Sequence, residues 1–421
     1  MAFDFPNAPT TNQLVTMADG TVRRWDGAKW VAGQTPTGPY CFIGDSPPTS
    51  PIPGTTWWCS ADAQLYLYYN DGNSSQWVPA VAVPASIGEA PSNSNIYGRQ
   101  NGQWTNLSAS QLQGNVGRNL IHNSMFNVNQ RGTGPWATGG YTTDRWIQSF
   151  TNGTLSGSII SLSDADRTAI GDEAAKFSYQ FVATGGSAAA DFTGIFQALE
   201  DVRRLANKII TISLWARATS GTPKIGINLY QNFGTGGSPS TGVWANAQSV
   251  TLSTTWTRYS VTISIPSIAG KTLGTNNNDN LALWFWFSTG TNQNANAGNI
   301  GVQSGTFQLW GIQVEIGSVA TQLEKIDYQD DLKHCQRFYA VGRAYYTGYG
   351  AAAITVSAPN FLPVSMRATP SIVITNQASN NITSPSIGAL SGSASTLLTT
   401  GTATASGGVI VDMSYTASAD L

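Results

Sequence analysis

The sequence has little charge, few cysteines and no long hydrophobic run. Charged residues make up 10% of its 421 residues, against about 25% in a typical soluble domain. The formal net charge is −2 at pH 7, so a basic surface for nucleic acid is not expected. The longest dense apolar run covers only residues 281–287, which is far too short to span a bilayer. We therefore expect no nucleic-acid partner and no membrane insertion.

The three cysteines are Cys41, Cys59 and Cys335. Their number is odd and their spacing is wide, which excludes a disulfide framework and a zinc site of the usual pattern. Residues 1–6 carry no basic stretch and no long apolar stretch, so we expect no secretory signal and a protein synthesised in a cytoplasm. Glycine, serine, threonine, asparagine and glutamine take the place of charge, and none of them strongly favours a helix.

Proline marks the N-terminal part of the chain. Eleven of the 19 prolines precede residue 92. Between the proline-rich tracts lie three similar segments, residues 21–30, 65–78 and 96–105, in which aromatic residues precede an Asp-Gly or Asn-Gly pair and a tryptophan follows it. Asp-Gly and Asn-Gly fit the two left-handed positions of a type I′ turn, so each segment predicts a β-hairpin.

A two-stranded hairpin is only marginally stable by itself in water. We therefore predict that residues 1–117 form an arm of β-hairpin modules on proline-rich tethers, whose tryptophans pack against other surfaces. Two interpretations are open: the arm docks on a partner or on copies of itself, or the hairpins fold onto the main domain of the same chain. The expected packing and attachment residues are Trp25, Trp30, Trp58, Trp77 and Trp104.

The pattern changes to successive half-buried strands in residues 118–332. Apolar residues alternate with polar ones in residues 210–214, 225–229 and 259–265, as in antiparallel strands with one polar face. In residues 306–316 the alternation slips by one position at Trp310-Gly311, which indicates a β-bulge. Many such strands joined by Asn-, Gly- and Thr-rich loops predict a jelly-roll β-sandwich.

One helix is expected, over residues 327–337, because acidic residues come early in this segment and basic residues come late. The last segment, residues 333–421, is rich in Ser, Thr, Gly and Ala and contains short apolar strands such as residues 371–375 and 408–412. It predicts a small C-terminal β-sandwich, and the whole chain is therefore expected to be all-β.

Residues 281–287 are the strongest candidate for a binding surface. Leu281, Leu283, Phe285 and Phe287 should face the core, which places Trp284 and Trp286 together on the opposite face. That face is either buried between layers, or a subunit interface, or an aromatic platform for a ligand. Pyranose rings stack on tryptophan and tyrosine, while their hydroxyls pair with nearby polar groups. Tyr230 and Trp244 flank the Gly/Ser-rich residues 234–242, where they either anchor this loop or form the rim of a glycan site.

The sequence offers few residues in arrangements that would support catalysis, so we expect that the protein is not an enzyme. His334 and Cys335 are adjacent on the predicted helix, where neighbouring side chains point in different directions. Asp191 with Glu200 or Asp201 are candidate carboxylate pairs for glycoside hydrolysis, but the sequence does not place them together. A structural calcium ion would need several oxygen ligands. Asp144, Asp172 and Glu315 are conceivable ligands, but no spacing specifies a site, so no metal site and no cofactor are assigned.

Several stretches resemble a known family. Residues 119–132 with 141–146 resemble the opening of the carbohydrate-binding-module-like jelly roll of bacteriophage tail fibre proteins, and residues 313–321 with 335–339 resemble its end. Residues 361–370 are similar to a segment of the C-terminal part of those proteins, and the Trp57-Trp58 segment is similar to short modules of phage virion proteins.

This resemblance implies a structural fibre of the virion, most simply a tail fibre. The N-terminal arm would attach to other virion proteins, and the distal β-sandwiches would bind host surface polysaccharide for host attachment and receptor binding. A homotrimer is expected, because three-fold closure lets short arms cover each other's aromatics. Two alternatives are a capsid decoration or head fibre protein without an essential ligand and, less favoured, a glycan depolymerase.

Overall fold

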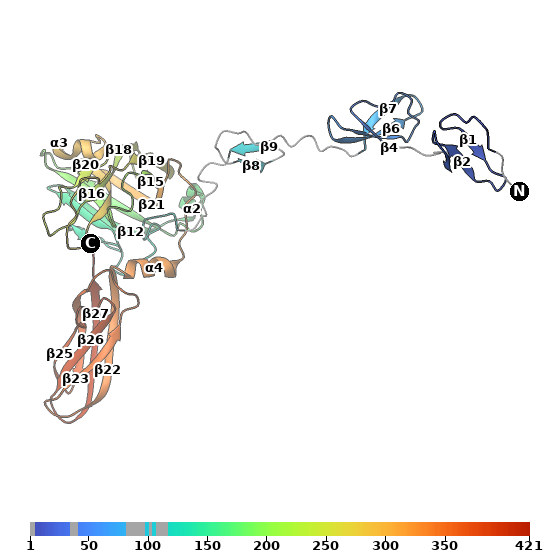
Figure 1. The fold of residues 1–421 in the computed structure, drawn as a ribbon. Helices are drawn as coiled ribbons and strands as arrows, with labels where there is room; N and C mark the ends of the chain where they lie inside the picture. Colours follow the sequence, from blue (N-terminus) through green and yellow to red (C-terminus); the bar gives the residue numbers. More distant parts are fainter. Residues whose placement is uncertain (1–4, 34–40, 81–96, 101–102, 107–116) are drawn as a thin grey trace. The chain divides into compact units, whose positions relative to one another are not determined.

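The computed structural model describes residues 5–33, 41–80, 97–100, 103–106 and 117–421, and it confirms the all-β class (Figure 1). The chain forms two compact units, Met1–Asn106 and Leu107–Leu421. The first unit contains three small sheets, and the second contains a central and a C-terminal β-sandwich. Within the described residues, the named strands pair in antiparallel fashion except for β4 with β5, which are parallel.

The first small sheet contains the hairpin predicted around Asp26-Gly27. Its strands β2 (Val22–Trp25) and β3 (Trp30–Ala32) pair directly, and β1 (Leu14–Thr16) adds a third strand. Trp25 and Trp30 are cross-strand partners with ring centroids 5.5 Å apart, and Phe5 stacks on Trp30 at 5.0 Å. Aromatic packing thus holds a sheet too small for a core of its own.

The second small sheet contains β4 (Cys41–Gly44), β5 (Thr56–Cys59), β6 (Gln64–Asn70) and β7 (Ser75–Pro79). Trp57 is its buried centre, stacked on Tyr66 at 5.1 Å and in edge contact with Trp77 at 5.6 Å. Trp58 is 41% exposed, because successive side chains of a strand point to opposite faces. Of the Trp57-Trp58 pair, Trp57 therefore packs within this sheet, whereas the role of Trp58 as an attachment residue stays a prediction.

The two described hairpin loops are longer than the predicted two-residue type I′ turns. Each has four residues, because Trp25 pairs with Trp30 and Asn70 pairs with Ser75. In both loops the aspartate carboxylate accepts two backbone N–H groups, from the residues two and three positions later. The aspartate side chain thus stabilises the loop as an Asx turn, and only the glycine adopts a left-handed conformation.

The third predicted hairpin is formed by β8 (Tyr97–Gln100) and β9 (Gln103–Asn106). Its expected Asn-Gly turn at residues 101–102 lies outside the described residues. Trp104 of β9 is 36% exposed. Whether a partner or another copy covers Trp58 and Trp104 stays a prediction.

We expect Trp57→Ala to unfold the four-stranded sheet, because truncation of a buried tryptophan costs about 3–5 kcal/mol. The variant also loses the hydrogen bond that the Trp57 indole Nε1–H donates to the carbonyl of Gly44 at 2.9 Å. Hydrogen–deuterium exchange of residues 56–79 in the full chain measures the effect. The matched control is Trp58→Ala, which should leave this exchange unchanged; equal loss of protection in the two variants would contradict the assignment.

The central domain is a jelly-roll β-sandwich (Figure 1, blue-green to light orange). One sheet has the order β10-β11-β14-β20-β16-β17, with β18 also on β16. The bounds of its strands are β10 (Gly140–Tyr141), β11 (Ile147–Thr151), β14 (Phe192–Glu200), β20 (Asn280–Thr289), β16 (Lys224–Asn232), β17 (Val243–Trp244) and β18 (Gln248–Thr251).

The second sheet has the order β12-β13-β21-β15-β19. Its strands are β12 (Thr154–Ser161), β13 (Phe177–Thr184), β21 (Gly305–Ile316), β15 (Ile209–Ala218) and β19 (Thr257–Ser264). The inward residues of both sheets form one continuous core, which includes Ile210, Ile227, Leu283, Phe285 and Phe307. The sequence pattern located β15, β16, β19, β20 and β21 with their core-facing residues, but it did not single out β10 to β14, β17 or β18.

The predicted bulge lies in β21. Its pairing with β15 shifts register between Ser213 and Trp215, and Gly311 adopts a left-handed φ of 61° there. Leu309 and Ile312 consequently both face the main core, while Trp310 is buried on the opposite side of the sheet. A glycine is needed here because an added Cβ would lie 3.0 Å from Leu323 and 3.4 Å from Trp215.

The predicted helix is α4 (Tyr328–Gln336), capped by the side chain of Asp327. Helix α2 (Asp164–Ile170) was not predicted, although Ser163 and Asp166 form a capping box that signals its start. The short α3 (Thr291–Asn294) and the 3₁₀ turn η1 (Ala295–Ala297) were not predicted either. Among the helices of the described ranges, none combines the length and apolar character that a membrane span requires.

The C-terminal domain packs two three-stranded sheets (Figure 1, orange to red). The sheet β22-β27-β24 contains β22 (Tyr339–Gly350), β27 (Gly407–Ser418) and β24 (Ser371–Asn380). The sheet β23-β26-β25 contains β23 (Thr355–Phe361), β26 (Thr396–Ala403) and β25 (Ile382–Ala389). Alternating residues of β26 and β27, such as Leu397, Val411 and Met413, form a small separate core, so the predicted β-sandwich is present.

Polar contacts and α4 join the two sandwiches. Arg131 forms an ion pair with Asp420 at 2.5 Å, and Glu200 pairs with Arg337 at 3.1 Å. On α4, the buried carboxylate of Asp331 accepts the backbone N–H of Asn123 at 2.8 Å. Burial raises the pKa of Asp331 to about 6, from an ordinary value of 3.8.

The raised pKa of Asp331 predicts a pH-dependent stability. Between about pH 4 and pH 6 the folded chain holds a proton that the unfolded chain has released, so the free energy of unfolding falls as the pH rises. A pKa difference of about 2 corresponds to roughly 3 kcal/mol. Asp331→Asn removes the charge and keeps an oxygen for Asn123, so it should stabilise the chain by up to that amount at about pH 8.

Urea denaturation at about pH 4 and about pH 8 checks this expectation, since the two proteins should differ only at the higher pH. Asp330→Asn on the same helix is the control, because the Asp330 side chain is 61% exposed and its loss should leave the pH profile unchanged. Equal stability of Asp331→Asn and the unmodified protein at both pH values would refute the role of Asp331.

Candidate functional site

Strand β20 exposes a second apolar face on the outside of the seven-stranded sheet. Leu281, Leu283, Phe285 and Phe287 belong to the main core, as predicted. Trp284 and Trp286 lie on the opposite face, where they stack nearly parallel with ring centroids 4.6 Å apart and an interplanar angle of 16°. We call the rings on this face the outer aromatic cluster. Its members are Phe192, Phe196, Tyr230, Trp244, Trp284 and Trp286.

Cross-strand register assembles this cluster. Trp284 is directly opposite Phe196 of β14, and their rings stack at 4.4 Å. Tyr230 of β16 is opposite Trp244 of β17 at 4.6 Å. Trp244 in turn contacts Trp284 at 5.9 Å and Trp286 at 5.6 Å. The rings therefore form one connected surface across four strands.

The members of the cluster differ in burial. Trp286 is 2% exposed, because Ala297 of η1 and Ile300 cover it. Phe196, Tyr230, Trp244 and Trp284 are half-buried and remain partly accessible. One interpretation of the sequence was that this face is buried. Trp286 is buried, whereas the other rings present apolar surface to the outside.

Small and polar residues complete the face. Gly194 and Gly226 flank Trp286 in register, and Ala198 and Ala282 lie in the row that contains Tyr230. Asn228, opposite Trp284, donates its side-chain N–H to the carbonyl of Asn296 at 2.9 Å. The indole N–H groups of Trp284 and Trp286 have no acceptor among the described residues, so ring packing rather than hydrogen bonding holds them.

The structure thus brings together the four candidate residues Tyr230, Trp244, Trp284 and Trp286. Phe192 and Phe196 were not among the candidate residues. They lie four positions apart in β14, and the period-2 pattern of that strand places them on one face, but the pattern alone does not say that this face meets Trp284.

The candidate catalytic pairs are not assembled. Asp191 and Glu200 flank and end β14, so at about 3.4 Å per residue they lie roughly 30 Å apart, too far for glycoside hydrolysis. Asp201 follows Glu200 and is equally distant from Asp191. His334 stacks on His122 with ring centroids 5.0 Å apart. Burial holds the pKa of the Cys335 thiol well above its usual value, which disfavours a reactive thiolate.

The conceivable calcium ligands are also dispersed, and each has other partners. Asp144 accepts two hydrogen bonds from Gln130, and Glu315 accepts hydrogen bonds from Thr321 and Gln313. Asp172 forms an ion pair with Lys325 at 2.8 Å. In the part of the chain that the structure describes, no three His, Cys, Asp or Glu residues gather as metal ligands would.

Comparison with known proteins returned solved structures only: no family model matches the sequence, and no curated protein matches it. One solved structure is the family 11 carbohydrate-binding module from Clostridium thermocellum in complex with a β-1,3-1,4-mixed-linked tetrasaccharide. It is 13% identical, with 42% of this chain and 90% of that chain covered and a TM-score of 0.27.

Two further solved structures are similar at the same level. The enzymatically active domain of tailspike protein 4 from bacteriophage CBA120 is 10% identical, with 47% of this chain and 21% of that chain covered and a TM-score of 0.27. A putative sugar binding protein from Bacteroides thetaiotaomicron VPI-5482 is 13% identical, with 48% and 100% covered and a TM-score of 0.29. Values this low carry no argument about what this chain binds.

We predict that Trp286 is a packing residue. Trp286→Ala should lower the free energy of unfolding by about 3–5 kcal/mol, because it leaves a cavity beneath Ala297 and Ile300. Thermal unfolding of the full chain checks this value. Trp244→Ala, which removes a half-buried ring from the edge of the same cluster, is the control and should cost clearly less; the reverse order would contradict the assignment.

Proposed function

We propose that the chain is a structural virion fibre that binds a host surface glycan with the outer aromatic cluster. The observation that carries the proposal is the joined, half-buried surface of Phe196, Tyr230, Trp244 and Trp284 on a rigid sheet. Such a surface suits the apolar faces of pyranose rings, which stack on aromatic side chains. No catalytic step is part of this proposal.

The surroundings of the cluster supply neutral hydrogen-bonding groups. The Gly/Ser-rich residues 234–242 lead into Trp244, and Thr235 receives hydrogen bonds from the side chains of Asn276 and Asn278, each at 2.9 Å. These loops therefore brace one another at the edge of the sheet. Sites that combine an apolar platform with a few fixed polar groups are typical of neutral ligands, and the low charge of the chain agrees with a neutral sugar.

Attachment and avidity complete the proposal. The small sheets of residues 5–106 carry partly exposed tryptophans, Trp58 and Trp104, which suit docking onto tail proteins of the virion. A homotrimer would present three copies of the aromatic cluster, and linked sites bind far more strongly than single ones. A fibre with individually weak sugar sites would thereby hold a cell surface.

Binding of the fluorescently labelled full chain to host cells tests the glycan role. We expect binding that blocks infection and that disappears after mild periodate treatment, which cleaves the vicinal diols of sugars. Persistence of binding after periodate would point to a protein receptor. Absence of binding by a verified trimer would favour a capsid decoration, and release of reducing ends from host polysaccharide would establish a depolymerase instead.

Trp284→Ala should weaken cell binding by about tenfold or more, because one aromatic contact contributes roughly 0.5–1.5 kcal/mol beyond its buried area. Trp284→Phe keeps a ring and should retain most of the binding. The control is Tyr345→Ala, which removes a 56% exposed ring from the C-terminal domain. If Tyr345→Ala abolishes binding while Trp284→Ala does not, the host contact lies in the C-terminal domain.

Sedimentation equilibrium tests the assembly. We expect a mass of three chains of 44.6 kDa each, and a stable monomer at micromolar concentration would overturn the homotrimer. Gold-labelled antibody on intact virions then locates the fibre: label on the tail supports the proposal, and label on the head supports the decoration alternative.

A further inference from the structure

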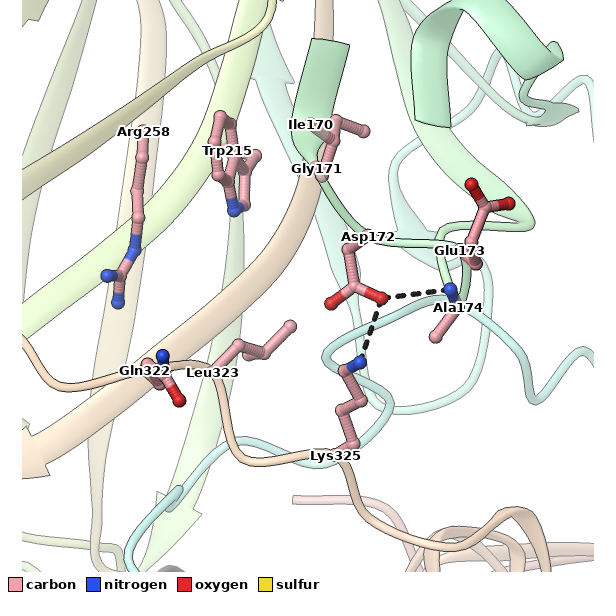
Figure 2. Close-up of a pocket in the computed structure, with 10 residues that line it drawn as sticks. All are labelled: Ile170, Gly171, Asp172, Glu173, Ala174, Trp215, Arg258, Gln322, Leu323 and Lys325. Carbon is pink, nitrogen blue, oxygen red and sulfur yellow. Dashed lines mark hydrogen bonds and ion pairs between the residues drawn. The ribbon is translucent and has the colours of Figure 1, made fainter. Parts of the chain in front are cut away.

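A cavity lies on the outer face of the five-stranded sheet of the central sandwich. It has a volume of about 490 Å³, within the range of roughly 300–1,000 Å³ that is typical of small-molecule sites. Figure 2 shows its two walls: residues 170–174 at the end of α2, and the segment from Gln322 to Lys325. Between them stand Trp215 of β15 and Arg258 of β19.

Trp215 and Arg258 are direct cross-strand partners, so their side chains extend from the sheet side by side (Figure 2). The indole of Trp215 is half-buried and packs, as Leu323 does, against the buried cluster that contains Trp310, with Gly311 beneath it. The indole Nε1–H of Trp215 has no acceptor among the described residues. Its nitrogen is absent from the set of buried polar atoms that lack a partner, so it is accessible from outside. Trp215 thus offers the cavity an apolar ring and a free hydrogen-bond donor.

Arg258 offers the cavity a partly desolvated cation. Its Nη2 donates to the Ser213 hydroxyl at 3.1 Å and to the carbonyl of Thr321. The remaining N–H groups, on Nη1 and Nε, have no acceptor in the described part of the chain, and Arg258 forms no ion pair there. Burial lowers the pKa of Arg258, and the nearby cation Arg118 lowers it further, against an opposing effect of Glu315. An anion would find three unused donors at this point.

The opposite wall carries carboxylates. Asp172 forms an ion pair with the Lys325 ammonium at 2.8 Å and accepts a hydrogen bond from the backbone N–H of Ala174 at 2.9 Å (Figure 2). The Glu173 side chain is 88% exposed, with Arg167 at 3.4 Å. Carboxylates accept hydrogen bonds from hydroxyls but repel a second anionic group. The cavity therefore favours a ligand with one anionic group, several hydroxyls and an apolar ring face.

We infer that this cavity binds a sugar acid, with the carboxylate on Arg258, the ring on Trp215 and hydroxyls on Asp172 and Gln322. The site is separate from the outer aromatic cluster and does not depend on it. The two would take different units of one polysaccharide or two different glycans. The low charge and the tryptophan content of the chain do not predict this specificity. It depends on the guanidinium of Arg258, which has no ion-pair partner among the described residues, lying beside the indole of Trp215.

Saturation-transfer difference NMR of the full chain with methyl β-glucuronide tests this inference. We expect saturation transfer to the ring protons of the glucuronide and much weaker transfer to methyl β-glucoside, which carries a neutral hydroxymethyl group in place of the carboxylate. Binding should weaken at high salt, because the carboxylate contact is electrostatic. Equal signals from the two glycosides, or no signal from the glucuronide up to about 10 mM, would overturn the inference.

Variants separate the two sites. Trp215→Ala and Arg258→Gln should each weaken glucuronide binding by about tenfold, whereas Trp284→Ala should leave it unchanged. Lys325→Gln, at a 52% exposed side chain, guards against a folding defect of Arg258→Gln and should weaken binding by about two- to threefold. The control is Lys208→Gln, an exposed cation that does not line the cavity. Unchanged glucuronide binding in a folded Trp215→Ala variant, or loss of it in Trp284→Ala, would refute the site.

Discussion

The two-sided packing of strand β20 is the constraint on which the central domain depends. Its odd-numbered residues from Leu281 to Phe287 meet the five-stranded sheet and form the sandwich core, while Trp284 and Trp286 stack on the outside. A strand that is apolar on both faces cannot lie at a solvent-covered surface. η1 and Ile300 therefore cover Trp286, and the rings of neighbouring strands gather around Trp284. The aromatic surface is thus a consequence of how this strand must be buried.

The few charged residues are largely structural. Buried carboxylates accept hydrogen bonds from irregular chain segments: Glu324 accepts the backbone N–H groups of Gly117, Arg118 and Asn119, and Asp331 accepts that of Asn123. A carboxylate that accepts several N–H groups offsets the cost of its own burial. This use explains why Asp144 and Glu315, which the sequence offered as calcium ligands, already have protein partners. Arg258, in contrast, keeps only hydrogen bonds to Ser213 and Thr321 and forms no ion pair among the described residues.

The N-terminal sheets apply a different solution to the same problem of burial. The first has too few strands for a core, so Trp25 and Trp30 pack edge to face across its hairpin, and in the second Trp57 contacts Trp77 two strands away. The hairpin positions followed from Asp-Gly and the flanking aromatics, because both signals are local. The loop type did not, because Asp26 and Asp71 use their side chains to hold four-residue loops, and a dipeptide does not reveal this choice.

The sequence by itself determined the all-β class, the main strands, the bulge at Gly311, helix α4 and the two faces of β20. These features depend on period-2 alternation, capping and charge order within one segment, which a single sequence displays. Only the tertiary structure decided that Phe196 meets Trp284, that Trp57 rather than Trp58 is inside, and that Trp215 lies beside Arg258. Such pairs depend on strand order and register between segments far apart in the chain. Local sequence patterns do not show which strands are neighbours in a sheet or in which register they pair. These contacts are therefore visible only in the assembled sheets.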